Sequence, residues 1–210
     1  MKELPLKLYI GKRGRKVFID ILLVAICYLI GNISSSILIG RIAAGIDIRD
    51  HGSGNAGTTN VLRTIGKKAA VATLAGDVLK GVLAVLLGRF FGGEYLAMLC
   101  GLAAFIGHIW PAVFEFRGGK GIATGMGAVI VLAPELAGIC ILTGLVIIIF
   151  TRYVSLGAII GGIALPIAAF FYSPEYFIWG LVVAIIAIIK HRANIQRLLK
   201  GTESKINFNK

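Results

Sequence analysis

Long apolar runs recur along this sequence, and several are long enough to cross a lipid bilayer as a helix. Residues 21–40 contain no charged side chain, and a hydrocarbon core about 30 Å thick needs roughly 20 such residues in a helix. Hydrophobic residues make up 57% of the 210 residues and charged residues only 15%, against about 45–50% and about 25% in soluble proteins. The sequence therefore predicts an integral membrane protein and excludes a soluble or intrinsically disordered one.

Seven apolar segments are predicted to be membrane-spanning helices: residues 21–40, 69–88, 95–114, 122–132, 136–150, 156–172 and 177–189. A Pro-Glu turn separates the fourth from the fifth, and Ser-Pro-Glu separates the sixth from the seventh. The first run is too long for a cleavable signal, and no small-residue cleavage site follows it. The 28 glycines suit close helix packing. The predicted fold is all-α, a polytopic membrane bundle of about seven helices.

One membrane-embedded domain is predicted over residues 17–206. A basic N-terminal extension, residues 1–16, precedes it, and a short tail, residues 207–210, follows it. The three cysteines all lie inside apolar runs, so we expect them to be buried thiols and not a disulfide framework.

Lysine and arginine concentrate in four segments: residues 41–68, residues 115–121, the connection at Arg152 and the C-terminal tail. With seven spans, these segments share one face of the membrane, which the positive-inside rule assigns to the cytoplasm. The opposite turns carry Glu94, Glu135 and Glu175. The basic residues of 1–16 by themselves favour the reverse orientation, which an even number of spans or a re-entrant first helix would reconcile. The net charge of +12 thus indicates binding to anionic lipid or to an anionic substrate, not to nucleic acid.

A glycine-rich polar segment follows the first span and has the composition of a phosphate site. Residues 51–63 read His-Gly-Ser-Gly-Asn-Ala-Gly-Thr-Thr-Asn-Val-Leu-Arg. Its glycines let backbone N–H groups approach a ligand, and Arg63 supplies a planar fork suited to phosphate. The alternative is a flexible loop, although such loops do not need so many amides and hydroxyls. The nucleotide-binding P-loop pattern is absent.

Two shorter basic segments have similar chemistry. Residues 117–121 read Arg-Gly-Gly-Lys-Gly, which combines exposed backbone donors with the charge of Lys120; the alternative is a turn with a snorkelling lysine. His191 and Asn194 are three residues apart and share a helix face. The alternative is that this segment is only a basic helix end that meets lipid. Asp77 and Lys80 are three apart within a span, and we interpret them as a structural ion pair.

These motifs in combination resemble the PlsY family, the bacterial membrane glycerol-3-phosphate acyltransferases that use acyl phosphate. The resemblance rests on residues 52–63 with 66–68, on residues 107–111 with 118–121, and on His191-Arg-Ala-Asn with Arg197-Leu-Leu. It extends from about Val17 to about Ile206. It implies a seven-span bundle with a cytoplasmic active site in the bacterial inner membrane. The first span departs from the usual pattern at residues 31–36, and the basic extension matches no family motif.

The resemblance also implies a reaction and a set of residues. The acyl group of an acyl phosphate passes to the 1-hydroxyl of sn-glycerol 3-phosphate, giving lysophosphatidate and phosphate for phospholipid biosynthesis. The implied catalytic residues are Arg63, Lys120, His191 and Asn194. The implied substrate-binding residues are Ser53, Asn55, Thr59, Asn60, Arg63, Gly118, Gly119, Lys120, Gly121, Ser155, His191 and Asn194. His191 is the candidate base, and a substrate phosphate oxygen is the alternative.

The expected partners are the two substrates and membrane lipid, and we expect a monomer. No metal site and no cofactor are indicated. A small-anion carrier would explain the basic loops equally, but the spans show no internal repeat and little mid-span polarity apart from Asp77 and Lys80. A purely structural, lipid-organising bundle does not explain the glycine-rich loops.

Overall fold

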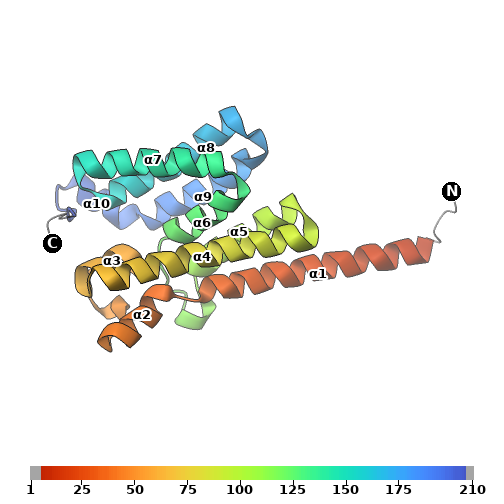
Figure 1. Cartoon of the computed structure of the whole chain (residues 1–210), viewed down its shortest axis with the longest axis horizontal. Coiled ribbons are helices and arrows are strands. Elements are labelled where there is room, and N and C mark those ends of the chain that lie inside the picture. Colours follow the sequence, from red (N-terminus) through yellow and green to blue (C-terminus); the bar gives the residue numbers. More distant parts are fainter. Residues whose placement is uncertain (1–5, 207–210) are drawn as a thin grey trace.

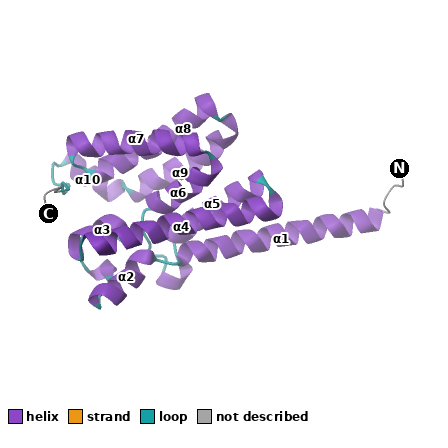
Figure 2. Cartoon of the chain, in the orientation of Figure 1, coloured by secondary structure: helices purple, strands orange, loops and turns teal. Residues whose placement is uncertain are grey.

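The computed structural model describes residues 6–206, and its regular elements in that range are all helices (Figure 2). The residues 1–5 of the basic extension and the tail 207–210 lie outside the described residues. The α-helices are α1 (Leu6–Asn32), α2 (Ser35–Ala44), α3 (Thr58–Thr64), α4 (Lys67–Gly92), α5 (Glu94–Ile109), α6 (Ile122–Leu132), α7 (Pro134–Thr151), α8 (Val154–Tyr172), α9 (Phe177–Lys190) and α10 (Arg192–Leu199). Short 3-10 turns occur at Ile48–Asp50, Ala112–Phe114 and Pro174–Tyr176.

Each of the seven predicted apolar segments forms helix, which confirms the all-α membrane bundle. Five helical segments within the described residues are long and apolar enough to cross a membrane, and α9 with α10, bent by 59°, would be a sixth. The remaining apolar helix, α6, has 11 residues. Side chains on the outer face are apolar and exposed, such as Phe150 at 84%, as expected of a surface that faces lipid.

The first predicted span is not one continuous helix. It breaks between Asn32 and Ser35 into α1 and α2, and Ser34 is extended at φ −87° and ψ 97°. At the other end, α1 begins at Leu6, so the later part of the basic extension continues the first span as helix and projects beyond the bundle (Figure 1).

Helix α4 lies at the centre of one half of the molecule, packed against α1, α5 and α6. Small residues allow this close approach: a methyl group added at Gly81 of α4 would lie 2.1 Å from the carbonyl oxygen of Thr124 on α6. Helix α8 packs against both α7 and α9, and these three helices form the second half. Figure 1 shows α2, α3 and α10 together at one end of the bundle, away from the N-terminus.

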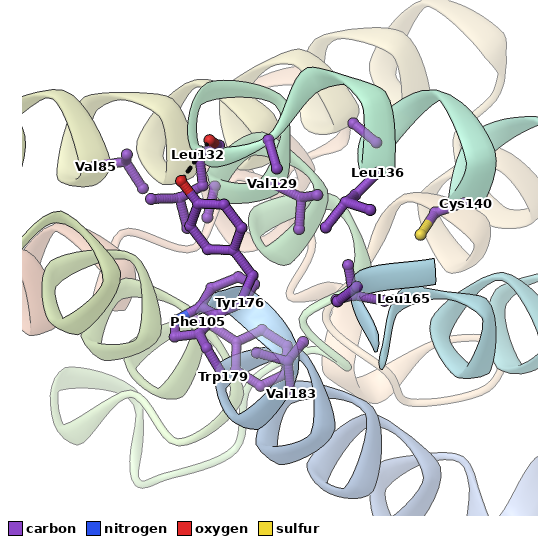
Figure 3. Packing of buried hydrophobic residues seen from close by; sticks show 14 of the residues in the cluster. Val85, Phe105, Val129, Leu132, Leu136, Cys140, Leu165, Tyr176, Trp179 and Val183 are labelled. Atoms are coloured by element: carbon purple, nitrogen blue, oxygen red, sulfur yellow. Dashed lines mark hydrogen bonds between the residues drawn. The ribbon is translucent and has the colours of Figure 1, made fainter. Parts of the chain in front are cut away.

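Buried aromatic and aliphatic side chains join the two halves. Phe105 of α5, Leu136 of α7, and Trp179 and Val183 of α9 belong to one core cluster (Figure 3). Tyr176 donates a hydrogen bond of 3.0 Å to the carbonyl of Leu132 across this core. The cluster holds α6 and α9 around a space that opens toward the end where α3 and α10 lie.

Candidate functional site

A cavity of about 570 Å³ lies between the two halves and reaches the polar end of the bundle. One part of its lining is polar and comes from α3, the loop before it, the loop before α6, the start of α8, the α9–α10 junction and Glu203. The other part is apolar and comes from α6, α7 and α8. A cavity of this size and mixed lining is typical of a small-molecule site.

The loop before α3 is organised by Asn60. Its Oδ1 accepts a hydrogen bond of 2.9 Å from the backbone N–H of Ser53. Its Nδ2 donates to the carbonyls of Ile48, at 3.0 Å, and His51, at 2.9 Å. Gly52 is required beside it, because its φ is +58° and an added methyl group would lie 2.3 Å from Asn60 Oδ1. Asn60 thus shapes the loop, with its polar atoms engaged by the backbone.

Arg63 lies near the end of α3 and lines the cavity. Its guanidinium donates a hydrogen bond of 3.0 Å to the backbone carbonyl of Ser204, 141 residues away. This contact brings the C-terminal segment across the polar end of the cavity. Arg63 retains further N–H groups beyond this bond.

The glycine loop at residues 118–121 rests on His108. The N–H of Gly119 donates to the His108 carbonyl at 3.1 Å. A methyl group at Gly118 would lie 2.0 Å from that carbonyl oxygen, and one at Gly119 would lie 2.2 Å from His108 Nε2. Gly118 and Gly119 therefore permit close packing behind the cavity, whereas Lys120 and Gly121 line it.

Glu203 connects the remaining polar side chains of the site. Its Oε1 accepts hydrogen bonds of 2.7 Å from Ser155 and from Asn194. Its Oε2 forms an ion pair of 2.6 Å with Arg197. Lys120 donates to the amide oxygen of Asn194, so a single buried carboxylate orients residues from α8, α10 and the glycine loop.

Burial and hydrogen bonding shift the ionisation of two of these groups. Burial lowers the pKa of Lys120 to about 8, partly offset by the negative charge of Glu203. Burial opposes the ionisation of Glu203, but the hydrogen bonds from Ser155, Asn194 and Arg197 outweigh it and hold the pKa of Glu203 below its ordinary value. The site therefore contains an ionised carboxylate and a lysine that loses its charge more readily than an exposed one.

His191 is buried at the junction of α9 and α10 and lines the cavity. Its Nδ1 lies 2.7 Å from the carbonyl oxygen of Ala187. Because a carbonyl only accepts, Nδ1 carries the proton and Nε2 is the ring nitrogen with a lone pair. The ring is thus fixed in the tautomer that a proton acceptor in the cavity requires.

The structure brings ten of the twelve predicted site residues to the cavity wall: Ser53, Asn55, Thr59, Asn60, Arg63, Lys120, Gly121, Ser155, His191 and Asn194. The predicted Gly118 and Gly119 lie behind the wall. Sequence reasoning missed Glu203. The signal available in the sequence was that Glu203 is the only acidic residue after Glu175, in a strongly basic segment.

Replacing Glu203 with glutamine is expected to destabilise the protein and reduce its activity. Glutamine keeps the shape but removes the charge that pairs with Arg197, and losing a buried, charge-assisted hydrogen-bond partner costs roughly 1–3 kcal/mol. The measurement is the thermal melting temperature in detergent together with turnover. Glu175→Gln, in a turn at the other end of the bundle, is the matched control. Equal melting temperatures for the two variants would contradict the prediction.

Comparison with known proteins identifies the family of the chain. The family model described as glycerol-3-phosphate acyltransferase matches residues 21–201 of the chain. The chain belongs to the glycerol-3-phosphate acyltransferase family. This confirms the resemblance inferred from the three motifs, and the matched range contains every residue of the predicted site.

Relatives and solved structures support the same membership along nearly the whole chain. The glycerol-3-phosphate acyltransferase of Alkaliphilus metalliredigens is 50% identical over 188 residues, which cover 90% of this chain and 96% of the relative. That of Clostridioides difficile is 44% identical and covers 93% and 99%. The crystal structure of PlsY (YgiH) in its glycerol 3-phosphate form matches with a TM-score of 0.83 and 36% identity, covering 90% of this chain and 96% of that one. Its lysophosphatidic acid form matches with a TM-score of 0.82. The chain is therefore an integral membrane protein of this family.

Proposed function

We propose that this protein transfers an acyl group from acyl phosphate to the 1-hydroxyl of sn-glycerol 3-phosphate, releasing lysophosphatidate and phosphate. The observation that carries the proposal is the two-part lining of one cavity. A basic, amide-rich end suits two phosphate groups, and the adjoining apolar part suits an acyl chain. The solved PlsY structures that match the fold are described as glycerol 3-phosphate and lysophosphatidic acid forms, which supports the same acceptor and product.

The polar end has the cations that two phosphate substrates require. Two unit charges about 5 Å apart repel by roughly 3 kcal/mol at an effective dielectric near 20. Arg63, Lys120 and Arg197 all line this part of the cavity. They come from three separate segments: α3, the loop before α6, and α10. Holding both phosphates against their repulsion places the acyl carbonyl near the acceptor hydroxyl.

The apolar part suits an acyl chain that enters between helices. Cys140 and Gly144 of α7 and Gly157, Gly161 and Leu165 of α8 line it. The glycines hold α7 and α8 close, since a methyl group at Gly157 would lie 2.6 Å from the Gly144 carbonyl oxygen. They also leave no side chain projecting into the cavity at those positions. A saturated chain gains roughly 0.8 kcal/mol per buried methylene in such a space.

The chemistry needs one new bond and one proton acceptor. The 1-hydroxyl oxygen of glycerol 3-phosphate forms a bond to the acyl carbonyl carbon, and the bond from that carbon to the phosphate oxygen breaks. Phosphate leaves with the electron pair, and the hydroxyl proton passes to Nε2 of His191. Lys120 and Arg63 stabilise the charge that develops on the phosphates. Acyl phosphate is already an activated anhydride, so no covalent enzyme intermediate is required.

We place the cavity on the cytoplasmic side of a bacterial inner membrane. The basic segments that precede α4, α6 and α8 and the α9–α10 junction lie at the end of the bundle that carries the cavity's polar lining. Excess lysine and arginine marks cytoplasmic loops. Both substrates are anionic, so the same charges attract them to the cavity.

The direct test is phosphate release from palmitoyl phosphate by the purified protein in detergent, with and without sn-glycerol 3-phosphate. We expect release that depends on the acceptor and yields lysophosphatidate. Release without the acceptor would make the protein a phosphatase. No release from a folded protein and fresh donor would overturn the proposal, and glycerol 3-phosphate flux across sealed vesicles would then test a carrier.

The pH dependence should follow the charge of Lys120. A lysine is cationic below its pKa, and the pKa of Lys120 is lowered by burial to about 8. The phosphates are already dianions above pH of about 7, so substrate binding should weaken as pH rises through about 8. We expect KM to increase between pH 7 and 9.5. Lys120→Arg is the matched control, because arginine stays charged throughout, and its KM should change less over this range.

A further inference from the structure

Two buried side chains and one backbone carbonyl surround the ammonium group of Lys80 beside the cavity. Lys80 of α4 donates to the Ile33 carbonyl at 2.8 Å and to His108 Nδ1 at 2.7 Å. It also forms an ion pair of 2.9 Å with Asp77, one helical turn earlier. A lysine ammonium has three N–H groups; two of them bond to the Ile33 carbonyl and His108, and the Asp77 carboxylate contributes an ion pair. These three partners come from the break between α1 and α2, from α5 and from α4.

This arrangement fixes the tautomer of His108. An ammonium only donates, so with Lys80 charged the Nδ1 of His108, 2.7 Å away, accepts and the ring proton is on Nε2. Asp77 Oδ1 lies 3.6 Å from the same nitrogen and is the acceptor for the opposite tautomer. That Nε2–H points toward the glycine loop, because a methyl group at Gly119 would lie 2.2 Å from Nε2 and 2.5 Å from the carbonyl oxygen of Ala56. Asp77 and His108 both contribute to the cavity wall, so the cluster reaches the site and is not confined to helix packing.

The same histidine supports the loop through its backbone. Gly119 donates to the His108 carbonyl at 3.1 Å, and Gly118 packs on that carbonyl too closely for any side chain. The next loop residue is Lys120, whose ammonium is in the cavity wall. A buried ion pair in a membrane span is costly, and here it anchors the break between α1 and α2, the centre of α4 and the end of α5 at one point.

We propose that Asp77, Lys80 and His108 form a positioning cluster that holds the 118–121 loop in the geometry that binds a substrate phosphate, with the Nε2–H of His108 directed at the loop. This inference rests on the proposed function and adds residues to it. Asp77 orients Lys80, Lys80 orients His108, and His108 holds the loop. The ligand chemistry is a phosphate monoester dianion, from glycerol 3-phosphate or from the acyl phosphate.

The main test compares two substitutions of His108. Glutamine places an amide N–H near the position of Nε2, whereas phenylalanine keeps ring volume without any donor. We expect His108→Phe to raise KM for one of the two phosphate substrates by at least about tenfold with a smaller change in kcat, and His108→Gln to remain within roughly threefold of the wild type. Separate KM values for glycerol 3-phosphate and palmitoyl phosphate identify which phosphate the loop holds. Phenylalanine performing as well as glutamine, or a loss in kcat alone, would overturn the proposal.

A second measurement does not depend on activity. The chain has three histidines, so ¹⁵N-histidine NMR of the detergent-solubilised protein resolves few signals, and His108→Gln assigns the signal of His108. We expect the wild type to show the Nε2–H tautomer and Lys80→Met to lose that preference. A proton on Nδ1 in the wild type would overturn the cluster.

A matched ion pair at the other end of α4 serves as control. Arg89 and Glu94 are 2.9 Å apart, and Glu94→Gln should leave both KM values unchanged. If the wild type transfers no acyl group, the proposed function fails. The NMR result and the Kd for glycerol 3-phosphate then still test whether Asp77, Lys80 and His108 form the positioning cluster. A variant that melts well below the wild type is replaced by Asp77→Asn, for which we expect the same selective loss of phosphate affinity.

Discussion

Replacing Lys120 or Arg63 with alanine is expected to reduce acyl transfer by more than about tenfold, which corresponds to about 1.4 kcal/mol of transition-state stabilisation. Both residues line the polar end of the cavity. Each is held by a contact to a distant segment, Lys120 by Asn194 and Arg63 by the Ser204 carbonyl. Removing either cation leaves the repulsion between two bound phosphates less compensated, so the effect should be large in kcat/KM.

The measurement is kcat/KM for each substrate in purified variants whose melting temperature matches the wild type. Lys200→Ala is the control, because Lys200 is an exposed basic residue of the same tail that is not among the cavity residues. Its kcat/KM should stay within roughly twofold of the wild type. If an alanine variant of Lys120 or Arg63 keeps more than about a tenth of the activity, the proposed role of that cation in offsetting the phosphate repulsion is wrong.

Replacing His191 is expected to lower kcat by about 10²–10⁴, the usual contribution of a positioned general base. Its Nδ1 donates to the Ala187 carbonyl, so Nε2 is the nitrogen available to take the hydroxyl proton. His191→Asn separates two roles, because an asparagine amide can replace the Nδ1 hydrogen bond but has no basic nitrogen. We expect His191→Asn to be as inactive as His191→Ala.

Restoration of activity by asparagine would show that His191 positions the helix junction or a substrate and that a phosphate oxygen accepts the proton. The measurement is single-turnover acyl transfer at saturating substrates, which reports chemistry apart from binding. His51→Ala is the control, because this exposed histidine is not among the residues that line the cavity.

Much of the fold was predictable because hydropathy is a local property. Runs of apolar residues bounded by Pro134, Ser173-Pro174 and Gly93 must form helices in lipid, where every backbone polar group needs an internal partner. The helix α6 matches the predicted segment at both ends. The break between α1 and α2 could not be predicted in this way, because the Ile33 carbonyl finds its partner in Lys80, 47 residues away.

The glycine-rich loops were likewise predictable only in part. Their composition predicted a phosphate site, and Lys120 and Gly121 do line the cavity. Composition did not distinguish these two residues from Gly118 and Gly119. The latter two must be glycine because His108 packs directly behind the loop. Asn60 likewise looked like a ligand donor, yet its side chain holds the loop through three backbone contacts.

The sequence by itself determined the membrane class, the helical segments, the family and ten residues of the cavity wall, because these depend on residue type and short spacing. Only the tertiary structure decided that Glu203 orients Ser155, Asn194 and Arg197. It alone added His108 to the predicted Asp77–Lys80 ion pair, beneath the glycine loop. Both arrangements join side chains from different elements, such as Ser155 with Glu203 and Lys80 with His108. A buried charge needs charged or hydrogen-bonding partners, and these come from whichever segments the packing brings next to it. A local sequence pattern does not show which segments those are.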